Sequence, residues 1–283
     1  MSDQYLVVVS EPDPVAAAVV SRWGTPPATE DHVEGAPIRR LGRSALLLRR
    51  PRLHIQDERL DALLPASLQA LRPTLVFPSI HRSEQNVPCL TVHPLGNPGP
   101  DADVGGRPGA WDPSDPARMA ATLRALAERA GGIGWAATYE ATHHGPYLEL
   151  PAFFVEIGYG TADAPPPAAV DLLAEVIPRI EPTESDRVAV AIGGGHYAPH
   201  FTDLTLRRRW AFGHIVSRHA LATLTPASAR AALDATPGAQ GIVFARAEDA
   251  HHPSLAGLGP RLRDQEAPRR ERPTGDARPA SGT

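Results

Sequence analysis

Short apolar runs alternate with amphipathic segments along most of the chain. Apolar runs that end in polar or glycine-rich turns are typical of buried strands. These runs occupy residues 4–10, 44–50, 74–80, 133–141, 152–158, 186–195 and 240–246. Amphipathic segments with prolines in or near their first turns predict helices over 13–23, 115–132, 165–180 and 226–235.

Alternating strands and helices indicate an α/β fold, here a three-layer α/β/α sandwich with a mostly parallel, mixed sheet. We expect residues 1–263 to form a single α/β domain. Residues 264–283 contain almost no apolar side chains and are expected to be a disordered tail.

The composition is that of an ordinary soluble enzyme or binding protein, with 42% hydrophobic and 21% charged residues. A net charge of −4 argues against a general nucleic-acid binder, and the arginine clusters at 39–43, 49–52 and 207–209 are better explained as solvated faces than as phosphate contacts. The single cysteine, Cys89, fits a reducing compartment. Without a long apolar run or a signal-like N-terminus, we expect a cytoplasmic monomer that does not bind membranes.

Histidines at the ends of predicted strands are the strongest indication of a functional site. Six of the twelve histidines stand there: His81, His93, His143, His144, His196 and His214. Ligands bind at the carboxyl ends of strands in open α/β sheets, so this distribution predicts a shared metal site or acid/base site. The nearby carboxylates are Glu84, Glu140, Glu156 and Asp203. Glu156 lies inside an apolar strand, where it requires a metal, an arginine or a histidine as partner.

The stretch AIGGGHYAPHFTDL, residues 191–204, combines three glycines with two histidines. Neither GxGxxG nor GxxxxGK[ST] is present, so these glycines are not a nucleotide-binding fingerprint. They allow a sharp backbone turn that brings His196 and Tyr197 close to a ligand. His196 and His200 have the spacing of one helical face, but Pro199 argues against a regular helix there, and no standard zinc signature occurs.

Several unusual strings occur together in this chain: HRSE, LTVHPLGNPG, EATHHGP, FVEIG, IGGGHYAPHFTD and GHI. Together they resemble the archaeal and plant type of D-aminoacyl-tRNA deacylase. The resemblance implies a sandwich similar to that of phosphorylases and peptidyl-tRNA hydrolases. It also implies a zinc-dependent enzyme that cuts the ester between a D-amino acid and the terminal ribose of tRNA. The partner is then a D-aminoacyl-tRNA rather than DNA.

The resemblance also assigns roles to residues. The expected catalytic groups are His143, His144, Glu156 and His196. The expected zinc ligands are His93, His143, His144, His196 and Asp203, with Asp203 alternatively orienting a histidine. The expected substrate-binding residues are Arg82, Gly193, Gly194, Gly195 and Tyr197.

Three alternatives remain open from the sequence alone. The histidines can bind the terminal adenosine and phosphate in a metal-free mechanism. The chain can instead be a nucleoside phosphorylase or hydrolase, or a non-catalytic RNA-binding module.

Overall fold

The computed structural model describes residues 3–82, 87–160, 164–182, 187–258 and 260–262 and contains two β-sheets. The larger sheet has eight strands in the order β2-β3-β4-β1-β5-β8-β6-β7. In that order their bounds are Ala28–Val33, Ala36–Arg40, Ala45–Arg50, Tyr5–Ser10, Thr74–His81, Ala152–Gly158, Cys89–Pro94 and Ala136–Tyr139. Strands β4, β1, β5 and β8 are mutually parallel, whereas β6 runs antiparallel to β8.

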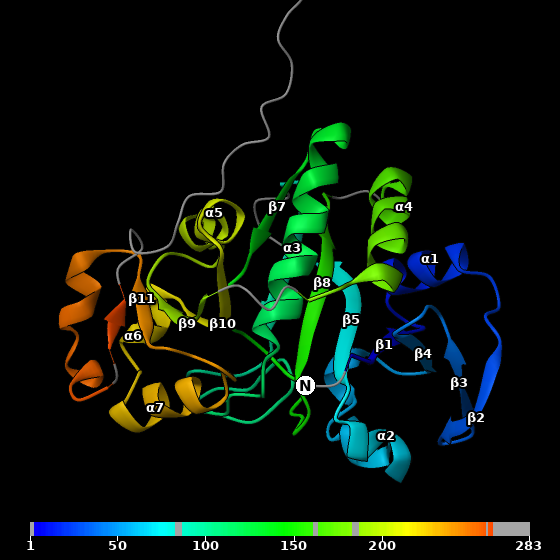
Figure 1. Cartoon of the computed structure of the whole chain (residues 1–283), viewed down its shortest axis with the longest axis horizontal. Coiled ribbons are helices and arrows are strands. Elements are labelled where there is room, and N and C mark those ends of the chain that lie inside the picture. The colour runs from blue at the N-terminus through cyan, green and yellow to red at the C-terminus, as the bar shows by residue number, and fades with distance from the viewer. Residues whose placement is uncertain (1–2, 83–86, 161–163, 183–186, 259, 263–283) are drawn as a thin grey trace, which may run out of the picture.

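Helices cover both faces of this sheet (Figure 1). One face carries α1 (Pro14–Arg22), α3 (Pro116–Ala130) and α4 (Pro167–Val176), and the other carries α2 (Ala66–Leu71). The alternation of side chains along β1 shows why both faces are apolar. Val7 and Val9 pack in the core beneath α1, α3 and α4, while Leu6 and Val8 pack in the core beneath α2.

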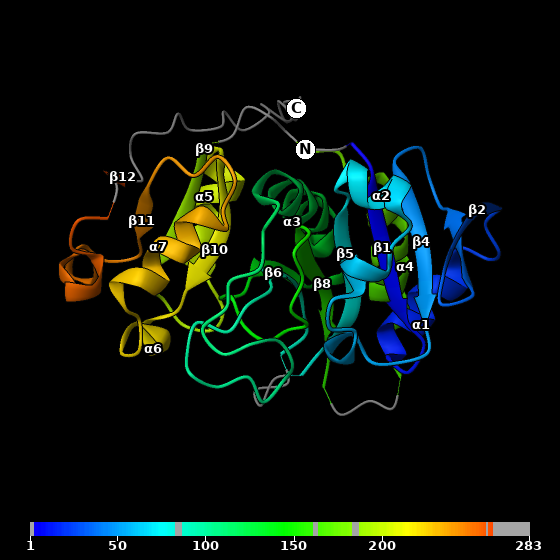
Figure 2. The same ribbon diagram turned by 90° about the horizontal axis from the view of Figure 1, so that it is seen from below.

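The smaller sheet is parallel and has the order β10-β9-β11-β12. Its strands in that order are Trp210–Val216, Arg187–Ile192, Ile242–Phe244 and Arg261–Leu262. Helix α5 (Pro199–Arg208) covers one face, and α6 (Arg218–Leu221) and α7 (Pro226–Asp234) cover the other. Short 3-10 helices span His54–Gln56, Leu60–Leu63, Gly131–Ile133, Ile177–Arg179, Ala247–His251 and Pro253–Leu255. Figure 2 shows the two sheets side by side, and one continuous apolar core contains side chains from both.

The α/β sandwich expected from the sequence is confirmed, and every predicted strand and helix is present, most with shifted ends and β8 with the predicted ones. The expectation of one sheet is corrected to two. The hairpin of β2 and β3 was missed because its residues are largely polar and half-exposed. Strands β6 and β10 were expected only as the strands that carry His93 and His214, without bounds, and strand β12 and helices α2, α5 and α6 were missed. The predicted tail at 264–283 lies outside the described residues.

Helix α5 corrects the interpretation of Pro199. The proline does not prevent a helix but begins one, since the first helical position needs no amide donor. His196 therefore precedes the helix while His200 lies on it, and the two do not share a helical face. Within the described ranges, no helix combines the length and apolar character needed to cross a membrane.

Candidate active site

Five of the six strand-end histidines lie in one cluster on the face of the large sheet that α2 also covers. His81 ends β5, His93 lies on β6, and His196 follows β9. His143 and His144 follow β7. The expected cause of this convergence was wrong in part, because β6 runs antiparallel to β8 and its carboxyl end points the other way. His93 and Glu156 meet because both project from the same face of paired strands.

Glu140, which follows β7, is the centre of the cluster. Its carboxylate is fully buried and lies 2.9 Å from Nε2 of His196 and 3.1 Å from Nδ1 of His81. Nε2 of His143 is 3.6 Å away. Neither carboxylate oxygen makes a well-directed hydrogen bond within the described part of the chain. A buried carboxylate in this state is costly unless a cation, or a proton moving between these groups, compensates it.

Glu156 has the histidine partners that its position in an apolar strand requires. Its carboxylate lies 3.4 Å from Nδ1 of His81 and 3.7 Å from Nε2 of His93. Burial alone would raise the pKa of Glu156, but the two histidines outweigh it and the pKa is lowered. Burial alone would lower the pKa values of His81 and His93. The nearby Glu156 carboxylate favours their protonated forms more strongly, so both pKa values are raised.

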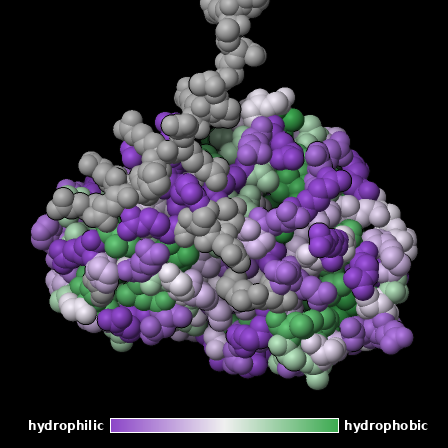
Figure 3. Space-filling model, viewed as in Figure 1, coloured by the Kyte–Doolittle hydropathy of each residue, from purple (hydrophilic) through white to green (hydrophobic). Residues whose placement is uncertain are grey.

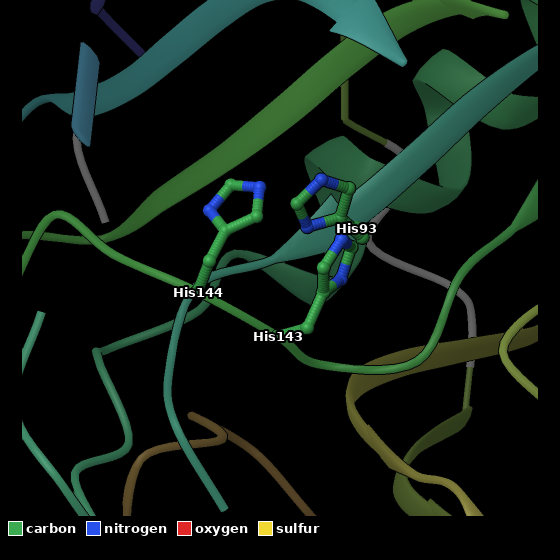
Figure 4. Close-up of side chains that lie close together, drawn as sticks. All are labelled: His93, His143 and His144. Atoms are coloured by element: carbon green, nitrogen blue, oxygen red, sulfur yellow. The ribbon is translucent and has the colours of Figure 1, made fainter. Parts of the chain in front are cut away.

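His93, His143 and His144 form a set of three imidazoles that fits a metal ion (Figure 4). Nδ1 of each ring lies 2.7–3.1 Å from a backbone carbonyl, that of Pro94, Ala141 or Gly145. A carbonyl only accepts hydrogen bonds, so each Nδ1 carries a proton, and in the neutral form of each ring the lone pair is on Nε2.

The three rings each bring one nitrogen within 4.8 Å of the others. Nε2 of His93 is buried and has no hydrogen-bond partner in the described chain. Burial lowers the pKa of His144 to about 4 and that of His143 well below its usual value, so both rings stay neutral at pH 7. A neutral imidazole nitrogen is a donor that zinc prefers, and a bound cation would displace the proton that Glu156 favours on His93.

A cavity of about 450 Å³ opens onto this cluster. Five residues expected from the sequence line it: Arg82, His143, His144, Glu156 and His196. Tyr197, also expected from the sequence, does not line the cavity. It contacts a histidine that does, because its hydroxyl lies 2.9 Å from Nε2 of His81. His81 and Glu140 belong to the cluster, as the general prediction of a shared site included them, although neither was assigned a specific catalytic, ligand or binding role. The signal that identified Glu156, a carboxylate within an apolar segment, also applies to Glu140.

The glycine run shapes the backbone rather than the cavity wall. Gly193 and Gly194 have φ angles of 108° and 81°, which confirms the sharp turn. The amide of Gly193 donates to the carbonyl of Val216, so it is committed to the sheet. Among the described cavity-lining residues there is no glycine of this run. His196 follows directly and reaches Glu140.

The structure does not bring Asp203, His200 or His214 to the cluster. Asp203 is exposed on α5 and pairs with Arg207 at 2.6 Å, a placement that does not support a role as metal ligand. His200 lies on the same helix. His214 is buried and bonds to Thr142 and to the carbonyl of Asp112, which makes it a packing residue. Glu84, the remaining carboxylate considered, lies outside the described residues.

The arginine clusters are largely engaged within the protein. Arg50 is buried and bonds to Asp57 at 2.8 Å, and Arg49 pairs with Glu11 at 2.9 Å. Arg207 pairs with Asp203. These contacts agree with the interpretation of the clusters as structural or solvated faces.

Comparison with known proteins gives a consistent result for the region that holds the cluster. The family model for D-aminoacyl-tRNA deacylase matches residues 71–255. A D-aminoacyl-tRNA deacylase of Thermoplasma acidophilum is 37% identical over 180 residues, covering 64% of this chain and 70% of that protein. One from Methanosphaerula palustris is 41% identical over 172 residues, covering 60% of this chain and 38% of that longer protein.

A solved structure shares the whole fold. It is described as a conserved protein of unknown function, AF0625, and is 26% identical to this chain with a TM-score of 0.78. The superposition covers 93% of this chain and 96% of that one. All the clustered histidines and both buried glutamates lie within the region that the family model matches.

Proposed function

Because the chain belongs to the D-aminoacyl-tRNA deacylase family, we propose that it hydrolyses the ester between a D-amino acid and the terminal ribose of tRNA. The products are free D-amino acid and tRNA. The observation that carries this proposal is the 450 Å³ cavity floored by histidines and buried carboxylates within the matched region. A phosphorylase or a non-catalytic RNA-binding module gives no account of that combination. The proposed enzyme acts as a cytoplasmic monomer, in keeping with the expectation from the sequence.

The proposal includes a zinc ion held by His93, His143 and His144. The support is the chemistry of these donors: the Nδ1 atoms of all three rings face carbonyls, so each ring in its neutral form offers the Nε2 lone pair to a metal. Bound zinc supplies a Lewis acid that polarises a carbonyl and lowers the pKa of a water to about 7.

His196 is the group best placed to move a proton in the cavity. Its side chain is 48% exposed, it lines the cavity, and its Nε2 lies 2.9 Å from the buried Glu140 carboxylate. In the proposed reaction His196 takes a proton from the attacking water and returns it to the departing ribose oxygen. Glu140 stabilises the imidazolium that forms in between, which is the usual role of a buried carboxylate beside a catalytic histidine.

The remaining groups hold this arrangement in place. Nδ1 of His81 lies close to the carboxylates of both Glu140 and Glu156, and its Nε2 contacts the Tyr197 hydroxyl. Glu156 contacts both His81 and His93 and so couples the zinc ligands to the proton-transfer groups. We assign His81, Glu156 and Tyr197 as positioning residues.

The test is deacylation of a D-aminoacyl-tRNA by the purified protein, run beside the L-aminoacyl-tRNA of the same amino acid. We expect rapid hydrolysis of the D-ester and little of the L-ester. A D-ester that disappears no faster than in buffer contradicts the proposed function. A chelator should abolish activity and added zinc should restore it, whereas full activity of metal-free protein contradicts only the zinc assignment.

A further inference from the structure

The mouth of the cavity is apolar, in contrast to its floor. On the face drawn in Figure 3, hydrophilic and hydrophobic residues are interspersed. Five large hydrophobic side chains are exposed in the described part of the chain: Leu53, Leu63, Leu71, Val87 and Val104. Leu53 and Val104 line the cavity and are 38% and 50% exposed. Exposed apolar side chains gathered at a cavity mouth are typical of a ligand contact.

The two apolar side chains lie on loops that the structure holds firmly. The carbonyl of Val104 accepts a hydrogen bond of 3.2 Å from the amide of Gly145, next to His144. The following Gly105 packs so closely on Ile55 that a side chain at 105 would collide with it. Leu53 and Ile55 lie on either side of His54, whose buried ring contacts Phe154 in the cavity wall. The apolar mouth is therefore built before any ligand binds, and it is tied to the histidine cluster.

The direction in which the substrate enters decides what this mouth contacts. The tRNA is far too large for a cavity of 450 Å³, so only its acylated end can reach the cluster. The amino acid must point toward the floor, where Glu156 and His81 are almost fully buried. The terminal ribose and its adenine must then lie at the exposed mouth. The face of a planar base can pack against the apolar side chains at that position, which removes apolar surface of both from water.

We propose that Leu53 and Val104 bind the terminal adenine of the aminoacyl-tRNA and that Arg82 contacts the phosphate on its 5′ side; this assignment rests on the proposed function. Arg82 lines the same cavity at its exposed end, and no carboxylate in the described residues forms an ion pair with it. Its side chain is exposed, so the guanidinium can reach a phosphate outside the cavity. The mouth recognises the part of the substrate that every tRNA shares, so it contributes affinity without selecting the amino acid.

The test measures KM and kcat for two D-aminoacyl-tRNAs, one with an aromatic and one with a small amino acid. Leu53→Ser and Val104→Ser should each raise KM on the order of tenfold for both substrates, with kcat unchanged. Leu63→Ser and Leu71→Ser are matched controls, because these leucines are similarly exposed (46% and 47%) but do not line the cavity. The controls should leave KM unchanged.

A shortened substrate separates the base from the phosphate. With a D-aminoacyl adenosine, the two serine variants should show the same rise in KM, whereas Arg82→Gln should have an effect only on the full tRNA. An unchanged KM in the serine variants overturns the proposal, as does a rise confined to the aromatic amino acid, which would assign the mouth to the amino-acid side chain. An inactive wild-type protein would instead refute the proposed function itself.

Discussion

Replacing His196 with alanine tests the proton-transfer assignment most directly. The imidazole is the exposed member of the cluster and contacts the buried Glu140 at 2.9 Å. Loss of a general acid/base group lowers turnover by about 10²–10⁴-fold, equivalent to about 3–5 kcal/mol of transition-state stabilisation. We expect His196→Ala to lose activity within this range, mainly in kcat.

The same substitution should leave the fold almost unchanged. About half of the His196 side chain is exposed, and its ring neighbours are His81, His143 and Tyr197 at centroid distances of 4.6–5.8 Å. Glu140 is fully buried, but without His196 it keeps His81 at 3.1 Å and His143 at 3.6 Å as partners. The free energy of unfolding should therefore fall by no more than about 1 kcal/mol.

The assay combines single-turnover release of a labelled D-amino acid from tRNA with urea unfolding of the same preparation. His200→Ala is the matched control, since this histidine lies nearby on α5 but outside the cavity, and its effect on turnover should be much smaller. Near-normal turnover of folded His196→Ala protein would refute the assignment. A large loss of stability, with turnover kept by the molecules that remain folded, would show that His196 is a packing residue.

Three further predictions concern the metal site, a glycine and a buried carboxylate. His93→Ala should lose bound zinc in elemental analysis and at least about 10²-fold in activity. The control His219→Ala, at an exposed position, should keep both the zinc and the activity. Zinc retained by His93→Ala would contradict the ligand assignment. Gly145→Ala places a methyl group against the backbone of Gly106 and should lower the free energy of unfolding in urea by about 1–3 kcal/mol. The control Gly132→Ala faces open space and should change that free energy little. Equal stabilities of the two variants would show that the loops adjust. Burial raises the pKa of Asp112 from 3.8 to about 8, so the folded state keeps a proton that the unfolded state releases and stability is lost as pH rises from about 4 to about 8. Asp112→Asn removes this term, so its stability relative to wild type should increase over that pH range; a constant difference would disprove the shift.

The local pattern of the chain was sufficient to predict most of the secondary structure and the composition of the site. Short apolar runs that end in polar turns and proline-capped amphipathic segments are local signals, and the elements they predicted are present. The histidines were recognisable because each lies near the end of an apolar strand or directly after one. The cost of burying an unpaired charge likewise showed that Glu156 must have a partner, and the structure supplies His81 and His93.

Only the tertiary structure decided which groups meet. The reversed direction of β6 places His93 beside Glu156, and a local pattern does not reveal whether neighbouring strands are parallel. Glu140 becomes the centre of the cluster because β7 pairs with β6 and the loop after β9 folds back over it. Asp203 is only seven residues from His196, yet its side chain faces solvent. His196 lies in the loop before α5 and reaches the site, whereas Asp203 lies on the outer face of α5 and pairs with Arg207 there. Proximity in the fold depends on strand order and helix orientation, which arise from packing the whole core rather than from any one segment.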